Sequence, residues 1–343
     1  MTIEGTTISA AQVHAAVEAA GLAPSIHNSQ PWTWRSIGDT LELSADLSRA
    51  LPVIDPDHRQ LLVSCGAALL NCWLSLRAAG FDVEVSELPD GPDIGAGRLA
   101  TLRVSGYRPP TEDETRLAAA ITERHTDRRP FQSGEVPVDE LRALRHAAEA
   151  EGCWLTALTS EDARVELAVL LTRADWAEHH DPDYQAELAA WTRTDPDAVD
   201  GIPGATADYS AHPRQADFPL RDFTGGADGA GAEAIGAGAP DGKVEHPQVL
   251  VLGTDADGPA DRLRAGRALG RVLLAATSAG LATSPLGQAI DIEATRALVR
   301  SATGGSGHTQ MILRVGYPDS SAAPLPVTKR RPVSEVLQGI PRP

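Results

Sequence analysis

The segment from Ala23 to Trp32 carries polar side chains at a spacing that suits the recognition of a flat ligand. It reads Ala-Pro-Ser-Ile-His-Asn-Ser-Gln-Pro-Trp, so Ser25, Asn28 and Gln30 offer one hydroxyl and two amides. Each of these groups can donate and accept hydrogen bonds, which matches the edge of a heteroaromatic ring better than a phosphate or a metal ion. The alternative is a turn in which Asn and Pro serve the backbone alone. We expect a ligand-facing loop between a helix and a strand.

Two basic clusters stand out because the chain as a whole is acidic, with a formal net charge of −17 at pH 7. One runs from Arg124 to Arg129, and the other is Lys329-Arg330-Arg331. A solvated charged surface is the usual explanation for such runs, but guanidinium groups can also hold a phosphate through paired hydrogen bonds. The acidic balance makes nucleic acids and anionic membranes poor candidate partners.

Several general features favour a protein of the cytoplasm. No apolar run is expected to reach the roughly 18–20 residues that a membrane-spanning helix needs, and residues 1–9 lack the layout of a signal peptide. Cys65, Cys72 and Cys153 are odd in number, and the first two share an apolar helical face, so we expect buried free thiols. His179 and His180 form an isolated pair in a polar stretch, so no metal site is expected.

The elements that must position these residues follow from periodicity and capping signals. Capping boxes at Ser9 and Thr111 each predict the start of a helix. The predicted helices cover residues 9–20, 61–79, 111–124, 138–150, 162–176, 183–191, 261–279 and 291–299, and the predicted strands cover 33–37, 40–44, 81–85, 98–104, 154–158, 249–252 and 310–315.

An internal repeat indicates two related halves. Residues 66–81 align with residues 266–281, and Gly66/Gly266 and Gly80/Gly280 stay in register. The alternative is that any two Ala/Leu helices closed by glycine align passably. Duplication would give one half at residues 1–106 and another at 107–343, packed against each other like two subunits of a dimer. The second half would contain an insertion at about 177–246.

The insertion is rich in Gly, Ala, Asp and Pro over residues 200–243 and has little periodicity, which is typical of flexible chain. It contains one more structured phrase, residues 217–223, with Phe218 and Phe223. A long loop with an aromatic phrase can serve as a lid, and a plain surface insertion is the alternative.

Ala23 to Trp32 resembles the flavin-contacting loop of the FMN-dependent nitroreductase family, whose usual form is A-P-S-x-x-N-x-Q-P-W. The run from Arg124 to Arg128 is similar to the family's phosphate motif, R-[RH]-[ST]-x-[RK]. Residues 315–318 (Val-Gly-Tyr-Pro) and the basic residues that follow resemble the family's closing segment. The cofactor-binding residues that this resemblance implies are Pro24, Ser25, Ile26, Asn28, Gln30, Arg124, His125, Thr126, Arg128, Pro285, Leu286, Gly287, Lys329, Arg330 and Arg331.

Two of these residues would have catalytic roles. Gly287 falls where the family places a backbone amide that faces flavin N5, and a residue without a side chain permits that close approach. Arg128 would lie near the pyrimidine edge of the ring and stabilise the negative charge that develops when flavin is reduced.

The two halves carry complementary parts of one site. The first half has the ring loop but no arginine in residues 1–9, and the second half has the phosphate motif but Glu149-Ala150-Glu151-Gly152 at the loop position. This layout resembles the Acg-like branch of the nitroreductase superfamily, which also has Asp-Pro-x-x-Arg and Ser-Cys-Gly-Ala. Residues 55–59 and 64–67 match both motifs.

The resemblance implies an α+β, nitroreductase-like fold, in which each half has a mainly antiparallel sheet with flanking helices. It implies one FMN in a functional monomer that mimics a dimer, with NAD(P)H as electron donor and a small-molecule acceptor, such as a nitroaromatic or a quinone. The alternative function is FMN storage beneath an occluding lid, with little turnover. A third, weaker hypothesis is a member that has lost flavin and serves as an interaction module.

Overall fold

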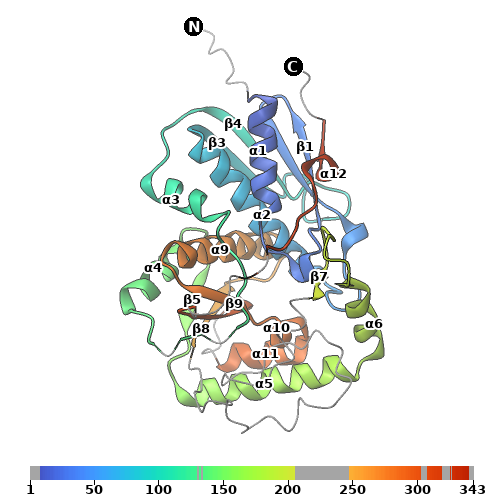
Figure 1. Cartoon of the computed structure of the whole chain (residues 1–343), viewed down its shortest axis with the longest axis vertical. Coiled ribbons are helices and arrows are strands. Elements are labelled where there is room, and N and C mark those ends of the chain that lie inside the picture. The colour runs from blue at the N-terminus through green and yellow to red at the C-terminus, as the bar shows by residue number, and fades with distance from the viewer. Residues whose placement is uncertain are drawn as a thin grey trace.

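The first part of the chain forms a five-stranded sheet packed against helices α1 and α2 (Figure 1). The computed structural model describes residues 8–129, 131–132, 134–204, 247–302, 307–318, 325 and 327–339. The sheet has the order β11-β1-β2-β4-β3, and its pairs are antiparallel except for β11, which is parallel to β1. The elements are α1 (Ala10–Gly21), β1 (Trp32–Ile37), β2 (Thr40–Ala45), α2 (Arg59–Ala78), β3 (Phe81–Glu87), β4 (Ala100–Tyr107), α3 (Glu112–Ala120), α12 (Val333–Val336) and β11 (Leu337–Gln338), with short 3-10 helices η1 (Ile26–Asn28) and η2 (Leu47–Arg49).

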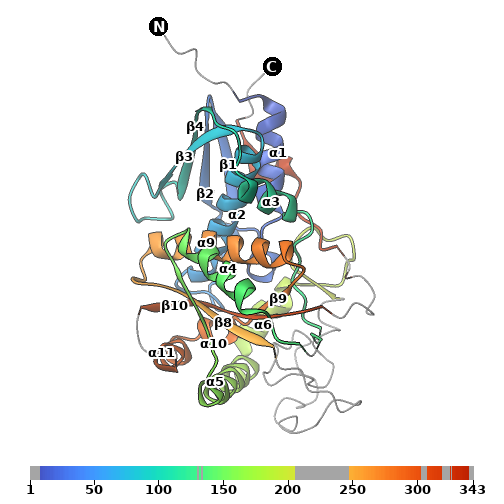
Figure 2. The same cartoon turned by 90° about the vertical axis from the view of Figure 1, so that its left-hand side faces the viewer.

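The second part forms a four-stranded antiparallel sheet with the order β5-β8-β10-β9. Helices α4 and α9 cover one face of it, and α5, α10 and α11 cover the other (Figure 2). The elements are α4 (Val138–Glu149), β5 (Trp154–Ala157), α5 (Glu161–His180), β8 (Gln248–Thr254), α9 (Pro259–Ser278), β9 (Ala282–Pro285), α10 (Gln288–Asp291), α11 (Glu293–Ala302) and β10 (His308–Gly316).

The burial of the two sheets explains their sequences. Residues of β1 alternate between buried and accessible, because one face of the first sheet packs on α1 and α2 and the other is open. β8 is buried almost throughout and reads Val249-Leu250-Val251-Leu252, because helices lie on both faces of the second sheet. Both strands therefore carry the residue pattern that their surroundings require.

Helices α2 and α9 lie against each other between the two sheets (Figures 1 and 2). They meet at Gly66 and Gly266. A Cβ added to Gly66 would lie 2.0 Å from the Leu263 carbonyl oxygen, and one added to Gly266 would lie 2.1 Å from the Val63 carbonyl oxygen. The contact is reciprocal, because each glycine meets the carbonyl three residues before the other. Only glycine permits backbones to approach this closely.

Most predicted elements are present, and both capping boxes, at Ser9 and Thr111, are confirmed. Three expectations need correction. The predicted helix at 111–124 ends at Ala120, and the helix predicted at 291–299 is present as α11 with shifted bounds, preceded by the short α10. The expectation that no segment is apolar enough to span a membrane was also wrong: α2 is long and apolar enough by composition, and 83% of its apolar window is buried inside the protein.

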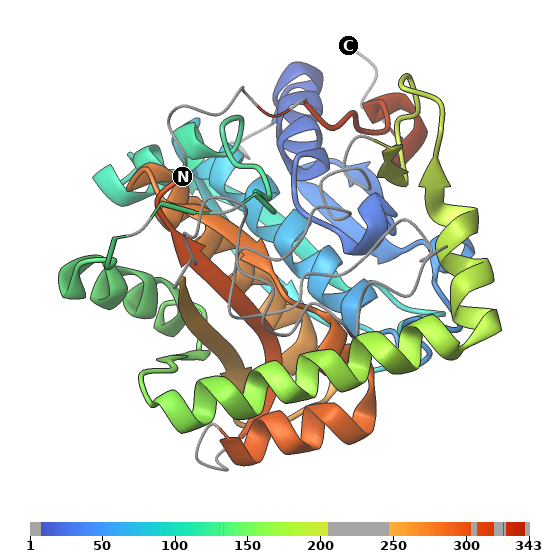
Figure 3. The ribbon, with the colours of Figure 1, turned by 60° about the horizontal axis from the view of Figure 1, so that its bottom comes forward.

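The first part of the insertion, residues 177–204, is structured. Helix α5 continues to His180 and is followed by α6 (Pro182–Trp191) and two short parallel strands, β6 (Thr192–Arg193) and β7 (Ile202–Pro203). Tyr184 and Leu188 of α6 pack against Leu51 and Ile54. Helix α6 lies on the same side of the molecule as the C-terminal helix α12 (Figures 1 and 3). Residues 205–246, including the phrase at 217–223, lie outside the described residues.

Candidate functional site

The loop after α1 has an enforced backbone conformation. His27, Asn28 and Gln30 have φ angles of 47°, 51° and 49°, which lie in a left-handed region that residues other than glycine rarely adopt. The Gln30 backbone N–H donates to Ser25 Oγ at 3.0 Å, which closes the loop on itself. Such strain persists only where surrounding contacts fix the backbone, and it clusters at functional sites.

Helix α2 supplies part of those contacts. The Ile26 backbone N–H donates to Ser64 Oγ at 3.1 Å, and the Cys65 thiol donates to the Pro31 carbonyl at 3.3 Å. Both α2 residues belong to the Ser-Cys-Gly-Ala segment, and Gly66 of the same segment provides the contact with α9. The segment therefore fixes the loop and the helix crossing together. All three cysteines are buried free thiols, as expected.

Gln30 joins the loop to two distant segments. Its Oε1 accepts from the Arg331 backbone N–H at 2.8 Å, and its Nε2 donates to the Val199 carbonyl at 2.8 Å. Asn28 Nδ2 donates to the Lys329 carbonyl at 3.3 Å. The loop, the insertion and the C-terminal segment thus meet at one place.

Two buried guanidinium groups lie beside this junction. Arg124 Nε and Nη1 and Arg330 Nε are buried and form no hydrogen bond within the part of the chain that the structure describes. Arg124 Nη2 is 3.5 Å from the Leu22 carbonyl oxygen, at the start of the loop. Burial, with the positive charge of Arg330 as a second cause, lowers the pKa of Arg124 to about 9, and burial lowers that of Arg330 to about 10. No carboxylate of the described residues pairs with either group, so the arrangement fits a bound anion.

The other residues of the two basic clusters have different surroundings. Lys329 forms an exposed ion pair with Asp197. Arg331 is largely buried and lies 3.3 Å from Glu335 and 3.7 Å from Asp46. In the first cluster, His125 is exposed, whereas Arg124, Thr126 and Arg128 are all half-buried. Arg124 and Arg330 differ from their described neighbours in both runs because they have buried guanidinium nitrogens that form no hydrogen bond with the described residues.

The turn after β9 contains the remaining predicted segment, residues 285–287. The Leu286 N–H donates to the Ile312 carbonyl at 2.9 Å, and the Gly287 carbonyl accepts from Ile290 at 2.8 Å. Gln288 Nε2 is buried and makes no hydrogen bond among the residues described. A Cβ on Gly287 would lie 3.2 Å from Asp291 Oδ2, so the turn has little room for a larger residue.

The buried polar atoms without a partner show what the site could hold. They include Arg124 Nε and Nη1, Arg330 Nε, Asn28 Oδ1 and Gln288 Nε2, and they come from the loop, from both basic clusters and from the turn after β9. Burying such groups without a partner is unfavourable. A ligand that carries an anionic group, hydroxyls and a polar ring edge would satisfy them. Over the same described residues, no group of three or more His, Cys, Asp or Glu side chains could hold a metal ion.

Sequence reasoning missed several residues that support these segments. Gln60 Nε2 donates to Asp291 Oδ1 at 2.9 Å, and Val199 binds the loop from the insertion. The only available signal for Gln60 was its place between two matched motifs, at residues 55–59 and 64–67, that have no evident chemistry of their own. Their contacts are long-range, so spacing in the chain cannot reveal them.

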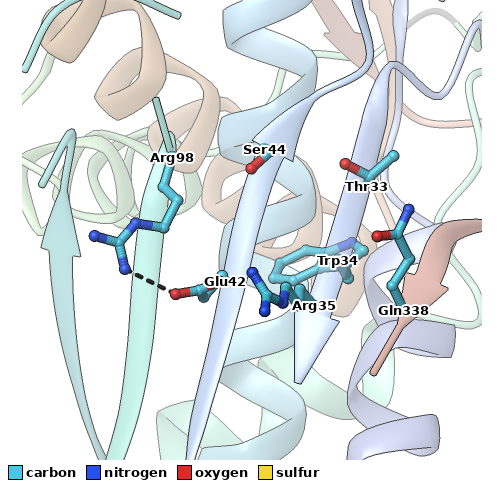
Figure 4. A pocket seen from close by; sticks show the side chains of 7 residues that line it. All are labelled: Thr33, Trp34, Arg35, Glu42, Ser44, Arg98 and Gln338. Carbon is cyan, nitrogen blue, oxygen red and sulfur yellow. Dashed lines mark hydrogen bonds and ion pairs between the residues drawn. The ribbon is translucent and has the colours of Figure 1, made fainter. Parts of the chain in front are cut away.

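A hollow of about 380 Å³ lies away from these residues, on the open face of the first sheet (Figure 4). Its side chains come mainly from β1 and β2, and Arg98 reaches Glu42 across it at 2.7 Å. None of the predicted site residues lines it. The lining residues are Thr33, Trp34, Arg35, Glu42, Ser44, Arg98 and Gln338.

Comparison with known sequences defines the class of the protein. A model of the Nitroreductase family matches residues 121–317, more than half of the chain. The chain belongs to this family. It is 37% identical to "Putative NAD(P)H nitroreductase Rv3131" of Mycobacterium tuberculosis over 92% of this chain and 88% of the relative. It is also 34% identical to "Putative NAD(P)H nitroreductase acg" of the same organism, over 97% of each chain. The predicted family and its Acg-like branch are confirmed.

Solved structures of the family are more distant in sequence. The chain is 16% identical to a nitroreductase with bound FMN from Bacteroides fragilis, with a TM-score of 0.38 over 62% of this chain and 94% of that one. It is 13% identical to a nitroreductase from Anabaena variabilis, with a TM-score of 0.41 over 82% of this chain and 69% of that one.

Proposed function

We propose that this protein is an FMN-binding oxidoreductase of the nitroreductase type. It would take electrons from NAD(P)H and pass them to a small acceptor such as a nitroaromatic or a quinone. The observation that carries the proposal is the pair of buried guanidiniums of Arg124 and Arg330, which lack a carboxylate partner among the described residues and adjoin the Pro24–Trp32 loop. A phosphate monoester would satisfy both groups, and FMN ends in one.

The other residues of the site would contact the ribityl chain and the ring of FMN. Asn28 Oδ1 would accept a hydrogen bond from a hydroxyl of the ribityl chain, and Gln288 Nε2 would donate to the ligand beside Gly287. Arg128 would lie at the pyrimidine edge, as the resemblance implies. When bound, FMN supplies the hydride chemistry, and the protein supplies orientation, exclusion of water and local charge.

We further propose that the chain is a fused pseudo-dimer with a single site. Two observations support this. The sheets share one strand order, β1-β2-β4-β3 against β5-β8-β10-β9, and the Gly66–Gly266 contact is reciprocal. The site would combine the loop of residues 1–106 with Arg124 of residues 107–343. Because the interface is already internal, the protein would act as a monomer, in the cytoplasm.

This proposal predicts one non-covalent FMN per chain in the purified protein. Each half contributes only part of a site, so a second equivalent of flavin has no phosphate ligands to bind it. The measurement is the flavin absorbance of the protein-free supernatant, set against the chain concentration from amino-acid analysis. Two flavins per chain, or an obligate dimer whose dissociation releases the flavin, would contradict the fused-dimer arrangement.

Turnover is tested by adding NADH and NADPH separately to the flavin-loaded protein without oxygen. We expect the visible absorbance of the flavin to bleach, and to return when a quinone or a nitroaromatic is added. Dithionite serves as the control, because it reduces flavin without a binding site for nicotinamide. Bleaching by dithionite alone would instead support the alternative function of flavin storage.

A further inference from the structure

A continuous chain of hydrogen bonds joins the Ile26 loop to the Gly287 turn through the first turns of α2. The Ile26 N–H donates to Ser64 Oγ at 3.1 Å, and Ser64 Oγ donates to the Gln60 carbonyl at 2.6 Å. Gln60 Nε2 then donates to Asp291 Oδ1 at 2.9 Å, and the Asp291 N–H donates to the Gly287 carbonyl at 3.0 Å. The two predicted ring-contacting segments are therefore held by one connected set of groups.

A second carboxyl group, that of Asp55, binds the same glutamine from the other side. Its Oδ1 accepts from the Gln60 backbone N–H at 3.0 Å and its Oδ2 from the Leu61 N–H at 2.8 Å, at the start of α2. Asp55 is only 5% exposed. Gln60 thus bridges two acidic side chains that come from segments more than 230 positions apart.

No cation among the described residues pairs with Asp55. The guanidinium of the nearby Arg59 binds other groups: its Nη1 donates to Asp257 Oδ1 at 2.6 Å and to Gln310 Oε1 at 2.7 Å. From α6, Glu187 approaches the same stretch and accepts from the Ile54 N–H at 2.7 Å. The charged groups around Asp55 are thus mainly acidic.

These surroundings determine when Asp55 ionises. Burial is the largest cause and raises its pKa to about 7, and the negative charge of Asp291 adds to the increase. The backbone N–H groups of Gln60, Leu61 and Arg59 act in the opposite direction but do not compensate. The carboxyl group therefore changes its charge within the pH range of the cell.

We propose that Asp55 is a positioning residue of the cofactor site, and that Asp55, Gln60 and Asp291 form a bridged carboxyl pair whose charge sets the reduction potential of the bound flavin. The inference rests on the proposed FMN site. Ionisation of Asp55 adds a buried negative charge to the connected groups that hold the two ring-contacting segments. This charge opposes the arrival of electrons on the ring and lowers its midpoint potential.

The first experiment measures the midpoint potential of the bound flavin from pH 5.5 to 8.5 in the wild type and in Asp55→Asn. The variant imitates the protonated acid, so we expect the two curves to coincide at pH 5.5 and to separate above pH 7, with the wild type lower. Asp291→Asn should move the steep region of the curve to lower pH, because Asp55 is no longer repelled by the Asp291 charge but is still buried. Asp57→Asn is the matched control, since Asp57 is an exposed carboxylate two positions away and should give the wild-type curve.

The second experiment detects the proton directly by infrared spectroscopy, with and without FMN. A protonated-carboxyl band should be present at pH 6, disappear by pH 8.5, and be missing in Asp55→Asn. A wild type without this titration, or an Asp55→Asn curve parallel to the wild-type curve at all pH values, would overturn the inference. A protein that shows the Asp55 carboxyl band and its loss with rising pH but binds no FMN would instead refute the proposed function. The two failures are therefore distinguishable.

Discussion

Replacing Gly66 by alanine is expected to force apart the two central helices and to lower the free energy of unfolding by about 3 kcal/mol. The added methyl group would lie 2.0 Å from the Leu263 carbonyl oxygen, and Gly266 Cα would lie 2.9 Å away. Both neighbours are backbone atoms, so no side chain can rotate to make room. We therefore expect a loss of stability at the upper end of the range that overpacking substitutions cause. Urea unfolding followed by circular dichroism measures it.

The matched control is Gly21→Ala, which also adds a methyl group to a glycine in a helix. No atom lies within 4 Å of that position, so the higher helix propensity of alanine should raise stability by up to about 1 kcal/mol. Gly266→Ala should resemble Gly66→Ala. The double variant should lose less than the sum of the two, because the first methyl group already separates the helices. A Gly66→Ala protein as stable as the wild type would show that α2 and α9 are not held at this distance in solution.

Local signals account for the elements that the sequence predicted well. The capping boxes at Ser9 and Thr111 involve residues three apart, so they can be recognised without knowledge of the fold. The repeat at 66–81 and 266–281 marks two helices whose glycines are needed for their mutual contact. The buried run Val249–Leu252 likewise reflects a strand covered on both faces.

Elements that depend on distant partners could not be predicted in the same way. Strand β11 is two residues long and pairs in parallel with Trp34 and Arg35 of β1, some 300 positions earlier. Nothing in its own sequence indicates that partner. The helix α6 was predicted at residues 183–191, but its packing partners were not: Tyr184 and Leu188 pack against Leu51 and Ile54, more than 100 positions earlier. Short elements of this kind gain their stability from tertiary packing rather than from intrinsic propensity.

In the candidate site too, residues that are close together in sequence could be predicted, and those that depend on distant contacts could not. The loop at Pro24–Trp32 and the cluster at Arg124 were found because their residues are close together in sequence. The pattern Lys329-Arg330-Arg331, however, cannot tell which cation is free to bind an anion. The structure distinguishes them. The Lys329 ammonium pairs with Asp197, and the Arg331 guanidinium donates to the Gln30 carbonyl. Arg330 Nη1 donates only to the carbonyls of its own segment, and Arg330 Nε has no partner among the described residues.

Arg124→Ala is expected to weaken FMN binding by about one to two decades while changing riboflavin binding little. The substitution removes a charge-assisted hydrogen bond to phosphate that is worth roughly 1.5–3 kcal/mol. Riboflavin has no phosphate, so its binding does not depend on this bond. The protein without flavin should not be destabilised by the loss of charge, because burial and the positive charge of Arg330 both lower the pKa of Arg124 and so disfavour its charged form. Titration of flavin fluorescence against protein gives both dissociation constants.

Variants of the second basic cluster make this prediction sharper. Arg330→Ala should also be selective for FMN, because the Arg330 guanidinium adjoins Arg124 and lacks a carboxylate among the described residues. Arg331→Ala should weaken FMN and riboflavin alike, since its guanidinium holds the Gln30 carbonyl at 3.3 Å and thereby the ring loop. Lys329→Ala should have the smallest effect, because its ion pair with Asp197 is exposed and such pairs contribute little. Equal losses for both flavins in Arg124→Ala would move the phosphate away from this residue and leave the buried pair without its proposed ligand.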